Sequence, residues 1–148
     1  MSLRLEARTV DLKMAKTYRL KLGQSAIHGR GLFAAERIPA GAWIIEYTGQ
    51  KISLAEGRRR DTFYNSIGYT LLFKLDTHYV DGLVGGNEAI YINHSLTPNA
   101  DAIMHRGGVW IRALCDIARG EELTYDYGFD PANPPGAKRR GGKRKKPA

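Results

Sequence analysis

The sequence predicts a mainly β domain made of small sheets, with few short helices. Short segments of alternating apolar residues, rich in β-branched and aromatic types, recur along the chain. Turns that contain glycine or proline separate these segments, and a single segment begins like a helix. The 148 residues, of which 43% are hydrophobic, are enough for the core of one domain and leave little room for a second.

The first half of the chain is expected to form two strands with two turns between them. In chain order these segments are the strand Tyr18–Leu22, the turn Gln24–Gly31, the turn Ile38–Gly41 and the strand Ala42–Tyr47. Ser53, followed three residues later by Glu56, resembles a capping box and predicts a short helix towards Arg60. Gly57 and three consecutive arginines argue against a longer helix.

The second half is expected to be almost entirely β. Its strands are expected at Tyr69–Lys74, His78–Asp81, Asn99–His105, Val109–Ala113 and Glu122–Tyr127. A glycine-rich turn at Gly82–Asn87 is expected to lead into one helical turn at Glu88–Ile92. The sequence Arg106-Gly107-Gly108 predicts a hairpin turn between two of these strands.

The formal charge of +8 is concentrated at the C-terminal end. Seven of the 23 basic residues lie between Lys138 and Lys146, whereas the last acidic residue is Asp130. The other 16 basic residues nearly balance the 15 acidic ones, so the rest of the chain carries a net charge of +1. We therefore divide the chain into an N-terminal extension (1–17), a folded domain (18–130) and a flexible basic tail (131–148).

Simple features of the sequence argue against several classes of protein. No stretch approaches the roughly 20 apolar residues of a membrane span, and the N-terminal residues lack the apolar centre of a signal peptide, so neither is expected. The single cysteine, Cys115, excludes an internal disulfide framework and a multi-cysteine zinc cluster. The histidines are scattered without metal-ligand spacing, so no metal site is expected.

Three motifs gather polar or aromatic groups, and each also has a purely structural explanation. The run His28–Gly31 either lets a ligand approach the backbone closely or simply forms a tight turn. Asn93–Ser95 needs polar partners, which are either an internal network or a bound ligand. Tyr125 and Tyr127 share one face of a strand, where they line a slot for a cation or form a half-buried aromatic strand.

In this order and spacing the motifs resemble those of the SET-domain protein lysine methyltransferases. The matching blocks are His28–Ala34, Glu46–Gly49, Gly86–Asn99 and Gly120–Phe129. The resemblance covers residues 18–130 and implies the SET-domain fold of small curved sheets, with a C-terminal pseudoknot that brings the Asn-His block beside the final tyrosine strand. In lacking cysteine-rich flanking segments, the chain resembles the minimal members of this family found in bacteria and viruses.

The resemblance also implies a cofactor, S-adenosylmethionine, and a substrate lysine that meets it through a narrow channel. Backbone groups of four consecutive residues are expected to wrap the cofactor: His28, Gly29, Arg30 and Gly31. Asn93 and His94 are expected to bind its adenosyl part, and Tyr69, assigned to the middle strand, is expected where cofactor and channel meet.

Catalytic roles are implied for four tyrosines: Tyr127, Tyr125, Tyr47 and Tyr69. The hydroxyl of Tyr127 is expected near the transferring methyl group, and Tyr47 and Tyr125 are expected to line the lysine channel. Asp126 is expected to face away and bond locally. Family members carry Tyr or Phe at the position of Tyr125, and the family pattern associates Tyr with mono- or limited methylation and Phe with higher methylation states. The resemblance therefore implies mono- or limited methylation here.

Two positions depart from the family pattern. Leu96 stands where many members have a zinc-binding cysteine, and no C-x-C-x₄-C segment follows, so no zinc is expected. Another element is then needed to cover the lysine, either the segment Pro131–Pro135 or a partner subunit. Ile90 replaces an arginine that usually precedes the aromatic residue of the Asn-His block, which leaves the cofactor contacts there undefined.

The expected partner is a protein with a lysine in a basic segment, such as a histone or a histone-like DNA-packaging protein. An alternative function is a catalytically weak SET-like scaffold that binds DNA through its basic tail. The tail between Lys138 and Lys146 has three further roles open to it: self-methylation, nucleic-acid contact and targeting. A homodimer also remains open, and the expected location is the cytoplasm or nucleoid of a bacterium, or a host nucleus for an exported effector.

Overall fold

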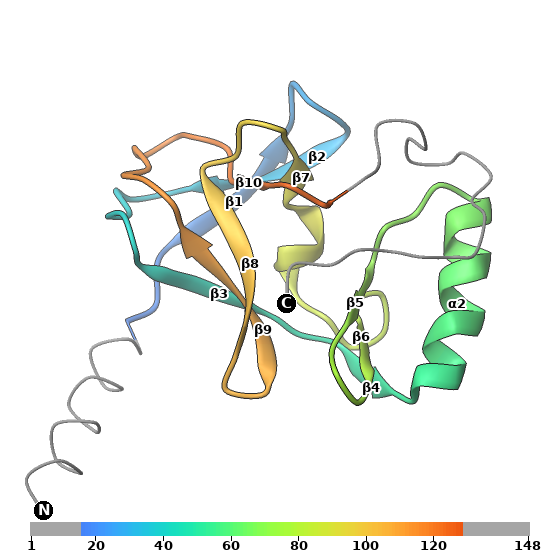
Figure 1. Cartoon of the computed structure of the whole chain (residues 1–148). Coiled ribbons are helices and arrows are strands. Elements are labelled where there is room, and N and C mark those ends of the chain that lie inside the picture. The colour runs from blue at the N-terminus through green and yellow to red at the C-terminus, as the bar shows by residue number, and fades with distance from the viewer. Residues whose placement is uncertain (1–15, 129–148) are drawn as a thin grey trace, which may run out of the picture.

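The computed structural model describes residues 16–128, which form four small β-sheets, one α-helix and one 3₁₀ helix (Figure 1). The predicted mainly β class is therefore confirmed. All of the predicted tail and most of the predicted N-terminal extension lie outside the described residues.

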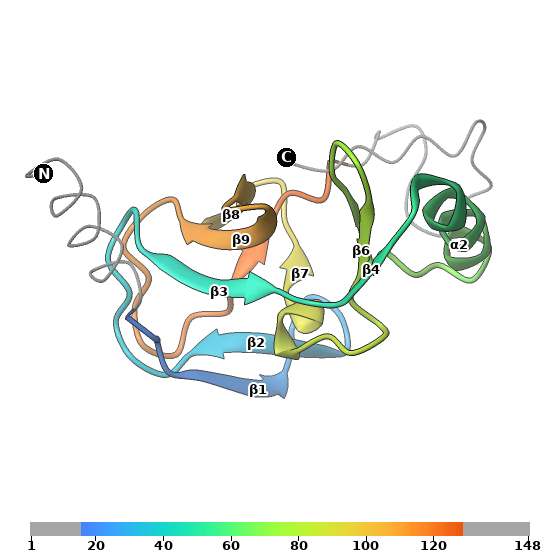
Figure 2. The same ribbon diagram turned by 90° about the horizontal axis from the view of Figure 1, so that it is seen from below.

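Two of the sheets, one of two strands and one of three, are antiparallel and contain the first strands of the described chain (Figure 2). β1 (Leu20–Gln24) pairs with β2 (Arg30–Ala34). β8 (Ala100–His105) and β9 (Gly108–Ala113) form the predicted hairpin, and β3 (Trp43–Tyr47) pairs with the other edge of β9. The two turn residues of the hairpin have φ angles of 53° and 76°, the left-handed backbone that tight hairpins favour.

A third sheet lies beside the only α-helix of the described residues (Figures 1 and 2). Its central strand, β6 (Tyr79–Asp81), pairs with β4 (Gln50–Ile52) on one edge and β5 (Leu72–Lys74) on the other. β5 is shorter than the predicted strand and begins three residues later. Helix α2 (Leu54–Ser66) packs against this sheet through a small core: Ile52, Tyr64, Leu72 and Tyr79.

The fourth sheet joins segments that are far apart in the sequence. After the 3₁₀ helix η1 (Glu88–Tyr91), β7 (Asn93–His94) pairs in parallel with β10 (Thr124–Tyr125). The Asn-His block therefore lies beside the final tyrosine strand, as the pseudoknot expectation required. β10 is shorter than predicted because Glu122 pairs with Phe33 of β2 instead of continuing along β7.

The main core lies between β2, the β3-β9-β8 sheet and the segment that returns to β10. Its largest fully buried side chains come from these segments, from β5 and from the connections after β2 and η1: Leu32, Ile38, Phe73, Ile92, Ile111, Ile117 and Leu123. Burial of a large apolar side chain contributes about 1.5–3 kcal/mol. This core therefore holds β7 and β10, and the polar motifs on them, in one position relative to β2.

Helix α2 begins at the predicted cap but is longer than predicted. The hydroxyl of Ser53 accepts a hydrogen bond from the Glu56 backbone N–H at 3.1 Å, which is the expected cap. The helix then continues past Arg60 to Ser66. Glu56 supports this extension because its carboxylate binds Nε of Arg59 at 2.9 Å and Nε of Arg60 at 2.7 Å.

Gly57, which argued for an early helix end, has a tertiary role instead. A Cβ atom at this position would lie 1.9 Å from Cδ1 of Tyr79 on β6. The glycine therefore lets the helix approach the sheet closely, and its intrinsic cost of about 1 kcal/mol in a helix is offset by this packing. The helix length could not be predicted from propensity because Tyr79 lies 22 residues further along the chain.

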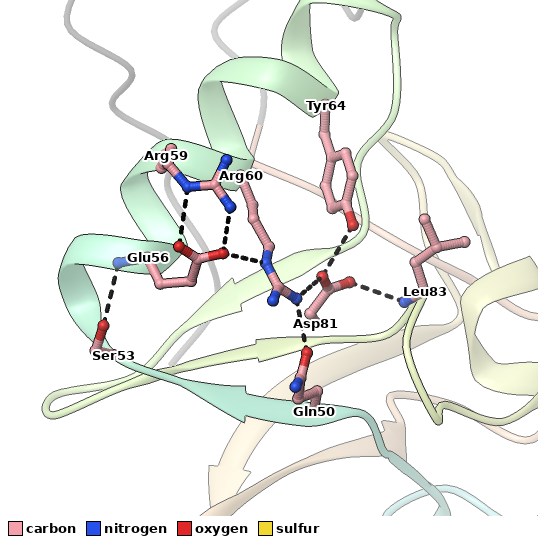
Figure 3. A network of polar contacts seen from close by, with 8 residues as sticks. All are labelled: Gln50, Ser53, Glu56, Arg59, Arg60, Tyr64, Asp81 and Leu83. Carbon is pink, nitrogen blue, oxygen red and sulfur yellow. Dashed lines mark hydrogen bonds and ion pairs between the residues drawn. The ribbon is translucent and has the colours of Figure 1, made fainter.

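A buried carboxylate fastens α2 to the third sheet (Figure 3). The side chain of Asp81 is fully buried, and its Oδ2 accepts hydrogen bonds from Arg60 Nη1 at 2.8 Å and from the Tyr64 hydroxyl at 2.9 Å. Its Oδ1 accepts from the backbone N–H of Leu83 at 2.9 Å, and Arg60 also binds Gln50 Oε1 at 2.8 Å. Since both carboxylate oxygens are bonded, this ion pair orients the helix as well as neutralising a buried charge.

Replacement of Glu56 by glutamine is expected to reduce the acid sensitivity of the fold. Hydrogen bonds from Arg59 and then from Arg60 lower the pKa of Glu56 from 4.5 to about 2. A lowered pKa stabilises the folded state above about pH 4.5, and this stabilisation is lost as the pH falls towards 2. Urea unfolding at pH 6 and pH 3 should therefore show a smaller loss of stability in Glu56→Gln than in the wild type; equal losses would contradict this assignment.

Three further features of residues 16–128 bear on function. No helix in this range has the length and apolar character needed to cross a membrane. The same range holds no group of three or more His, Cys, Asp or Glu side chains arranged to bind a metal ion. Cys115 is an exposed free thiol.

Candidate functional site

The first predicted motif forms an exposed turn between β1 and β2. The Ser25 N–H donates to the Gly29 carbonyl at 2.8 Å, which closes the turn. Gly29 has a φ angle of +48°, a conformation that favours glycine, and no atom lies within 4 Å of the Cβ position. His28, Gly29 and Arg30 are exposed, so their backbone is accessible to a ligand.

Asn93 of the second motif reaches this turn with its side chain. Its Nδ2 lies 3.1 Å from the carbonyl oxygens of both His28 and Arg30, and 3.1 Å from the hydroxyl of Ser25. These contacts connect residues more than 60 positions apart in the chain. The amide nitrogen of Asn93 therefore binds the turn. The expected contact of Asn93 with the adenosyl group stays a prediction, and it involves atoms of Asn93 other than this nitrogen.

Glu122, to which the sequence reasoning gave no role, lies at the centre of this contact. Its carboxylate accepts hydrogen bonds from the Ser25 hydroxyl at 2.7 and 2.9 Å and from Asn93 Nδ2 at 2.8 Å. A Cβ atom on Gly31 would lie 2.2 Å from Glu122 Oε1, so the second glycine of the turn provides space for the carboxylate. In the sequence, the clue to Glu122 was its position in the third motif. The local sequence pattern could not show which residues its carboxylate contacts.

An aromatic cluster fills the interior next to this network. The ring centroids of Tyr47 and Phe73 are 4.7 Å apart, those of Phe73 and Tyr125 are 5.9 Å apart, and those of Tyr125 and Tyr127 are 4.7 Å apart. His94 lies at the end of the row, 5.3 Å from the ring of Tyr127. Three of the four predicted catalytic tyrosines therefore lie together, with Tyr47 and Tyr125 each only 2% exposed.

Backbone atoms hold two of the tyrosines and the histidine in place. The Tyr47 hydroxyl donates to the Leu71 carbonyl at 2.8 Å, and the Tyr127 hydroxyl donates to the Ile92 carbonyl. Nδ1 of His94 accepts from the Tyr127 backbone N–H at 3.0 Å, which places the proton of a neutral imidazole on Nε2. The third motif is thus bonded to the second through both backbone and side chain.

Burial changes the acid–base behaviour of the cluster. The pKa of Tyr127 is raised above that of an ordinary phenol, first by burial and then by the negative charge of Glu122. The pKa of Tyr47 is raised as well, mainly by burial and further by Tyr127. Both phenols therefore stay protonated at neutral pH, so they act as hydrogen-bonding dipoles and not as proton-accepting phenolates.

Tyr69 is not part of this cluster. It lies between α2 and β5, outside any strand, so its expected position in the middle strand is wrong. Its side chain is 50% exposed, and its ring lies 6.5 Å from that of Tyr64 on α2. Phe73, which was not singled out from the sequence, lies between the rings of Tyr47 and Tyr125. It belongs to β5, and its side chain is buried in the core.

Asp126 bonds locally, as predicted. Its Oδ1 accepts from the backbone N–H of Gly128 at 2.8 Å and lies 3.8 Å from Nδ1 of His94. Leu96, at the position of the family's zinc-binding cysteine, is 73% exposed. Arg30 holds its guanidinium 5.2 Å from the ring centre of Tyr91, so this side chain follows the surface beside the turn.

The chemical character of these groups fits S-adenosylmethionine. The molecule carries a sulfonium cation next to an apolar methyl group, and such a cation is stabilised by aromatic faces and by oxygen atoms. The exposed turn at Gly29 and the half-buried pair His94 and Tyr127 supply polar atoms at the surface. The half-buried ring of Tyr127 is backed by the buried ring of Tyr125, 4.7 Å away between ring centroids.

Comparisons with known proteins agree with this arrangement. The sequence profile of the SET domain matches residues 29–128. A histone-lysine N-methyltransferase described as H3 lysine-4 specific from Aspergillus fumigatus is 44% identical over 118 residues, which are 75% of this chain and 10% of that protein. Histone-lysine N-methyltransferase 2B from Homo sapiens is 40% identical over 138 residues, covering 83% of this chain and 5% of its own length.

Solved structures are also similar to this chain in fold and sequence. The Chaetomium thermophilum Polycomb Repressive Complex 2 bound to GSK126 has 38% identity and a TM-score of 0.69, covering 80% of this chain and 17% of that chain. A structure described as "ctPRC2 in an autoinhibited conformation bound to S-adenosylmethionine" has 35% identity and a TM-score of 0.68, covering 80% and 16%. This chain spans about a tenth or less of the length of the two curated relatives. With the fold, the motifs and the profile in agreement, the chain belongs to the SET-domain family.

Proposed function

We propose that this chain is a protein-lysine N-methyltransferase that uses S-adenosylmethionine. The observation that carries the proposal is the row of aromatic rings from Tyr47 to Tyr127, which is bonded through β7 and β10 to the polar turn at Gly29. The relatives named as histone-lysine N-methyltransferases support the same activity. When bound, the cofactor supplies a methyl group on a positively charged sulfur, which an amine attacks.

Within the site, the protein's own residues prepare the amine and exclude water. A free lysine has a pKa of about 10.4, and the amine must be neutral to attack. The buried rings of Tyr47, Phe73 and Tyr125 provide an environment that disfavours the ammonium form. Tyr127, whose hydroxyl is held by the Ile92 carbonyl, is the residue we assign to stabilising the polarised methyl group.

The test is transfer of labelled methyl groups from S-adenosylmethionine to protein. Purified histones, a basic DNA-packaging protein and an extract of the source cells serve as substrates, and calorimetry with the cofactor alone measures binding. Label in a lysine-containing protein together with cofactor binding supports the proposal. Binding without transfer to any of these proteins would favour the alternative scaffold function, and absence of both would contradict the assignment.

We further propose that the substrate lysine lies in a basic segment and receives mainly one methyl group. The names of the curated relatives support a histone or histone-like substrate. Tyr125 supports limited methylation because it is 2% exposed and its ring lies against those of Phe73 and Tyr127. A hydroxyl in such a confined space leaves little room for an amine that already carries methyl groups.

Replacement of Tyr125 by phenylalanine is expected to raise the methylation state of the product. The change removes one oxygen from the confined space beside Tyr127 and keeps the ring contacts with Phe73. Mass spectrometry of the methylated peptide should show monomethyl-lysine as the main wild-type product and di- or trimethyl-lysine in the variant. Trimethyl-lysine as the main product of the wild type would refute the limited-methylation proposal.

A further inference from the structure

We infer that Glu122 is the positioning residue of the cofactor site, acting through Ser25 on the turn that carries Gly29. The inference rests on the proposed function for its relation to S-adenosylmethionine. It assigns Glu122 no contact with the reacting atoms. It states instead that the carboxylate keeps the turn and the Asn-His block in the arrangement that binds the cofactor.

The hydrogen-bond directions around Ser25 show why the carboxylate is needed. Three N–H donors lie within hydrogen-bond distance of Ser25 Oγ: the backbone N–H of Ile27 at 2.9 Å, that of His28 at 3.2 Å and Nδ2 of Asn93 at 3.1 Å. Since these three neighbours are all donors, the single hydroxyl hydrogen goes to Glu122. A carboxylate accepts on both oxygens and donates on neither, so it is the group that completes this set.

The position of Glu122 is in turn fixed by the backbone on either side of it. The residue pairs with Phe33 of β2, and the following Leu123 N–H donates to the Leu32 carbonyl at 2.8 Å. Nδ2 of Asn99 donates to the carbonyl of Glu122 at 2.8 Å. The carboxylate is thus carried by a segment anchored to the core, while the turn that it holds is exposed.

Gly31 provides independent evidence that the carboxylate and the turn are fitted to each other. A Cβ atom on Gly31 would lie 2.2 Å from Oε1 and 2.8 Å from Cδ of Glu122. No φ restriction explains this glycine, because Gly31 lies in β2 and is not among the positive-φ residues of the described range. The space is therefore reserved for the Glu122 side chain, next to Gly29 and the two carbonyl groups that bind Asn93.

The first experiment measures cofactor affinity and turnover in Glu122→Gln, with Glu121→Gln as the matched control. The glutamine keeps the size of the side chain but has one acceptor oxygen in place of two. Even if the amide oxygen keeps the bond to Asn93, an amide donor then faces the Ser25 hydroxyl where Oε2 of Glu122 accepts from it. Because hydrogen bonds to a charged group are strong, the dissociation constant for S-adenosylmethionine should rise at least about tenfold in Glu122→Gln. The turnover number at saturating cofactor should stay within about threefold of the wild type.

An unchanged dissociation constant in Glu122→Gln would overturn the inference, whether or not turnover at saturating cofactor falls. The neighbouring Glu121, which is exposed and caps a turn through the Ala118 N–H at 2.8 Å, should show wild-type values for both quantities when replaced. If Glu122→Gln is recovered only in aggregated form, Ser25→Ala serves as the second variant and should raise the dissociation constant in the same way.

A second measurement needs no cofactor and separates this inference from the proposed function. Hydrogen exchange of the Ile27 and His28 amides, which donate to Ser25, should be faster by about tenfold in the Glu122→Gln protein without ligand. A wild type that binds no S-adenosylmethionine contradicts the proposed function, and exchange then still tests the role of Glu122. Unchanged exchange at both amides overturns the positioning role.

A size-compensation cycle tests the fit between Gly31 and Glu122 directly. Gly31→Ala alone should weaken cofactor binding, because the added methyl group meets the carboxylate. In a Glu122→Ala background the same methyl group has space, so its additional effect on the dissociation constant should be about tenfold smaller. If the two substitutions act only by lowering the stability of the fold, their effects on the free energy of cofactor binding should add. Additive effects would therefore contradict the inference.

Discussion

Replacement of Tyr127 by phenylalanine is expected to lower the methyl-transfer rate by about 10²-fold or more. Removal of one preorganised polar group aimed at the transition state has effects of this size in other enzymes. Tyr127 has such preorganisation because its hydroxyl is bonded to the Ile92 carbonyl and its ring is held between those of Tyr125 and His94. The measurement is single-turnover transfer of labelled methyl groups at saturating cofactor and substrate.

The fold is expected to persist in this variant. The Ile92 carbonyl loses one hydrogen bond, which costs about 1 kcal/mol and leaves the ring contacts in place. Circular dichroism and urea unfolding therefore accompany the rate measurement. Tyr18→Phe, a change of the same kind at the edge of the core, is the control and should keep the wild-type rate. A rate in Tyr127→Phe within about threefold of the wild type would remove this residue from the catalytic assignment.

Replacement of Asp81 by asparagine is expected to destabilise the fold by about 3 kcal/mol. The reason is that Arg60 and the Tyr64 hydroxyl both donate to Oδ2 of a fully buried carboxylate, and an amide cannot satisfy both donors together with the Leu83 N–H (Figure 3). We expect the lower end of the range for broken buried pairs, because Arg60 keeps its bond to Glu56. Urea unfolding at pH 7 measures the change.

The matched control is Asp116→Asn. Asp116 also pairs with an arginine, Arg37, at 2.8 Å, but both side chains of this pair are more than half exposed. Solvent-exposed pairs contribute little because water screens them, so the control should lose much less stability than Asp81→Asn. Equal destabilisation by the two substitutions would show that burial of the Asp81 network does not contribute as proposed.

Much of the secondary structure could be predicted from local pattern. The hairpin of β8 and β9, the strand β3 and the cap of α2 at Ser53 occur where alternation, turn residues and capping residues indicated them. Some errors concern ends and lengths, as at β10, which stops at Tyr125, and three short strands, β2, β4 and β7, were not predicted at all. Glu122 and Tyr127 lie outside that strand because their bonds go to Phe33 of β2 and to His94.

The candidate site was predicted in part. The residues His28, Asn93, His94, Tyr125 and Tyr127 belong to motifs whose order and spacing indicated the family, and the structure brings these motifs together. Tyr69 was predicted to begin the strand Tyr69–Lys74, and its place beside the cofactor was implied by the family resemblance. The structure places it beside α2, where its ring contacts Tyr64, because tertiary packing determines where β5 begins.

The sequence by itself determined the fold class and the family, because the motifs that indicate them consist of residue types at short spacing, and the resemblance predicted which residues form the site. Only the tertiary structure decided the roles of Glu122, Phe73 and Gly57. Ser25 and Glu122 are 97 residues apart, and Gly57 is needed because Tyr79 packs on it. Such contacts depend on which segments the core brings together, and local periodicity carries no information about that choice.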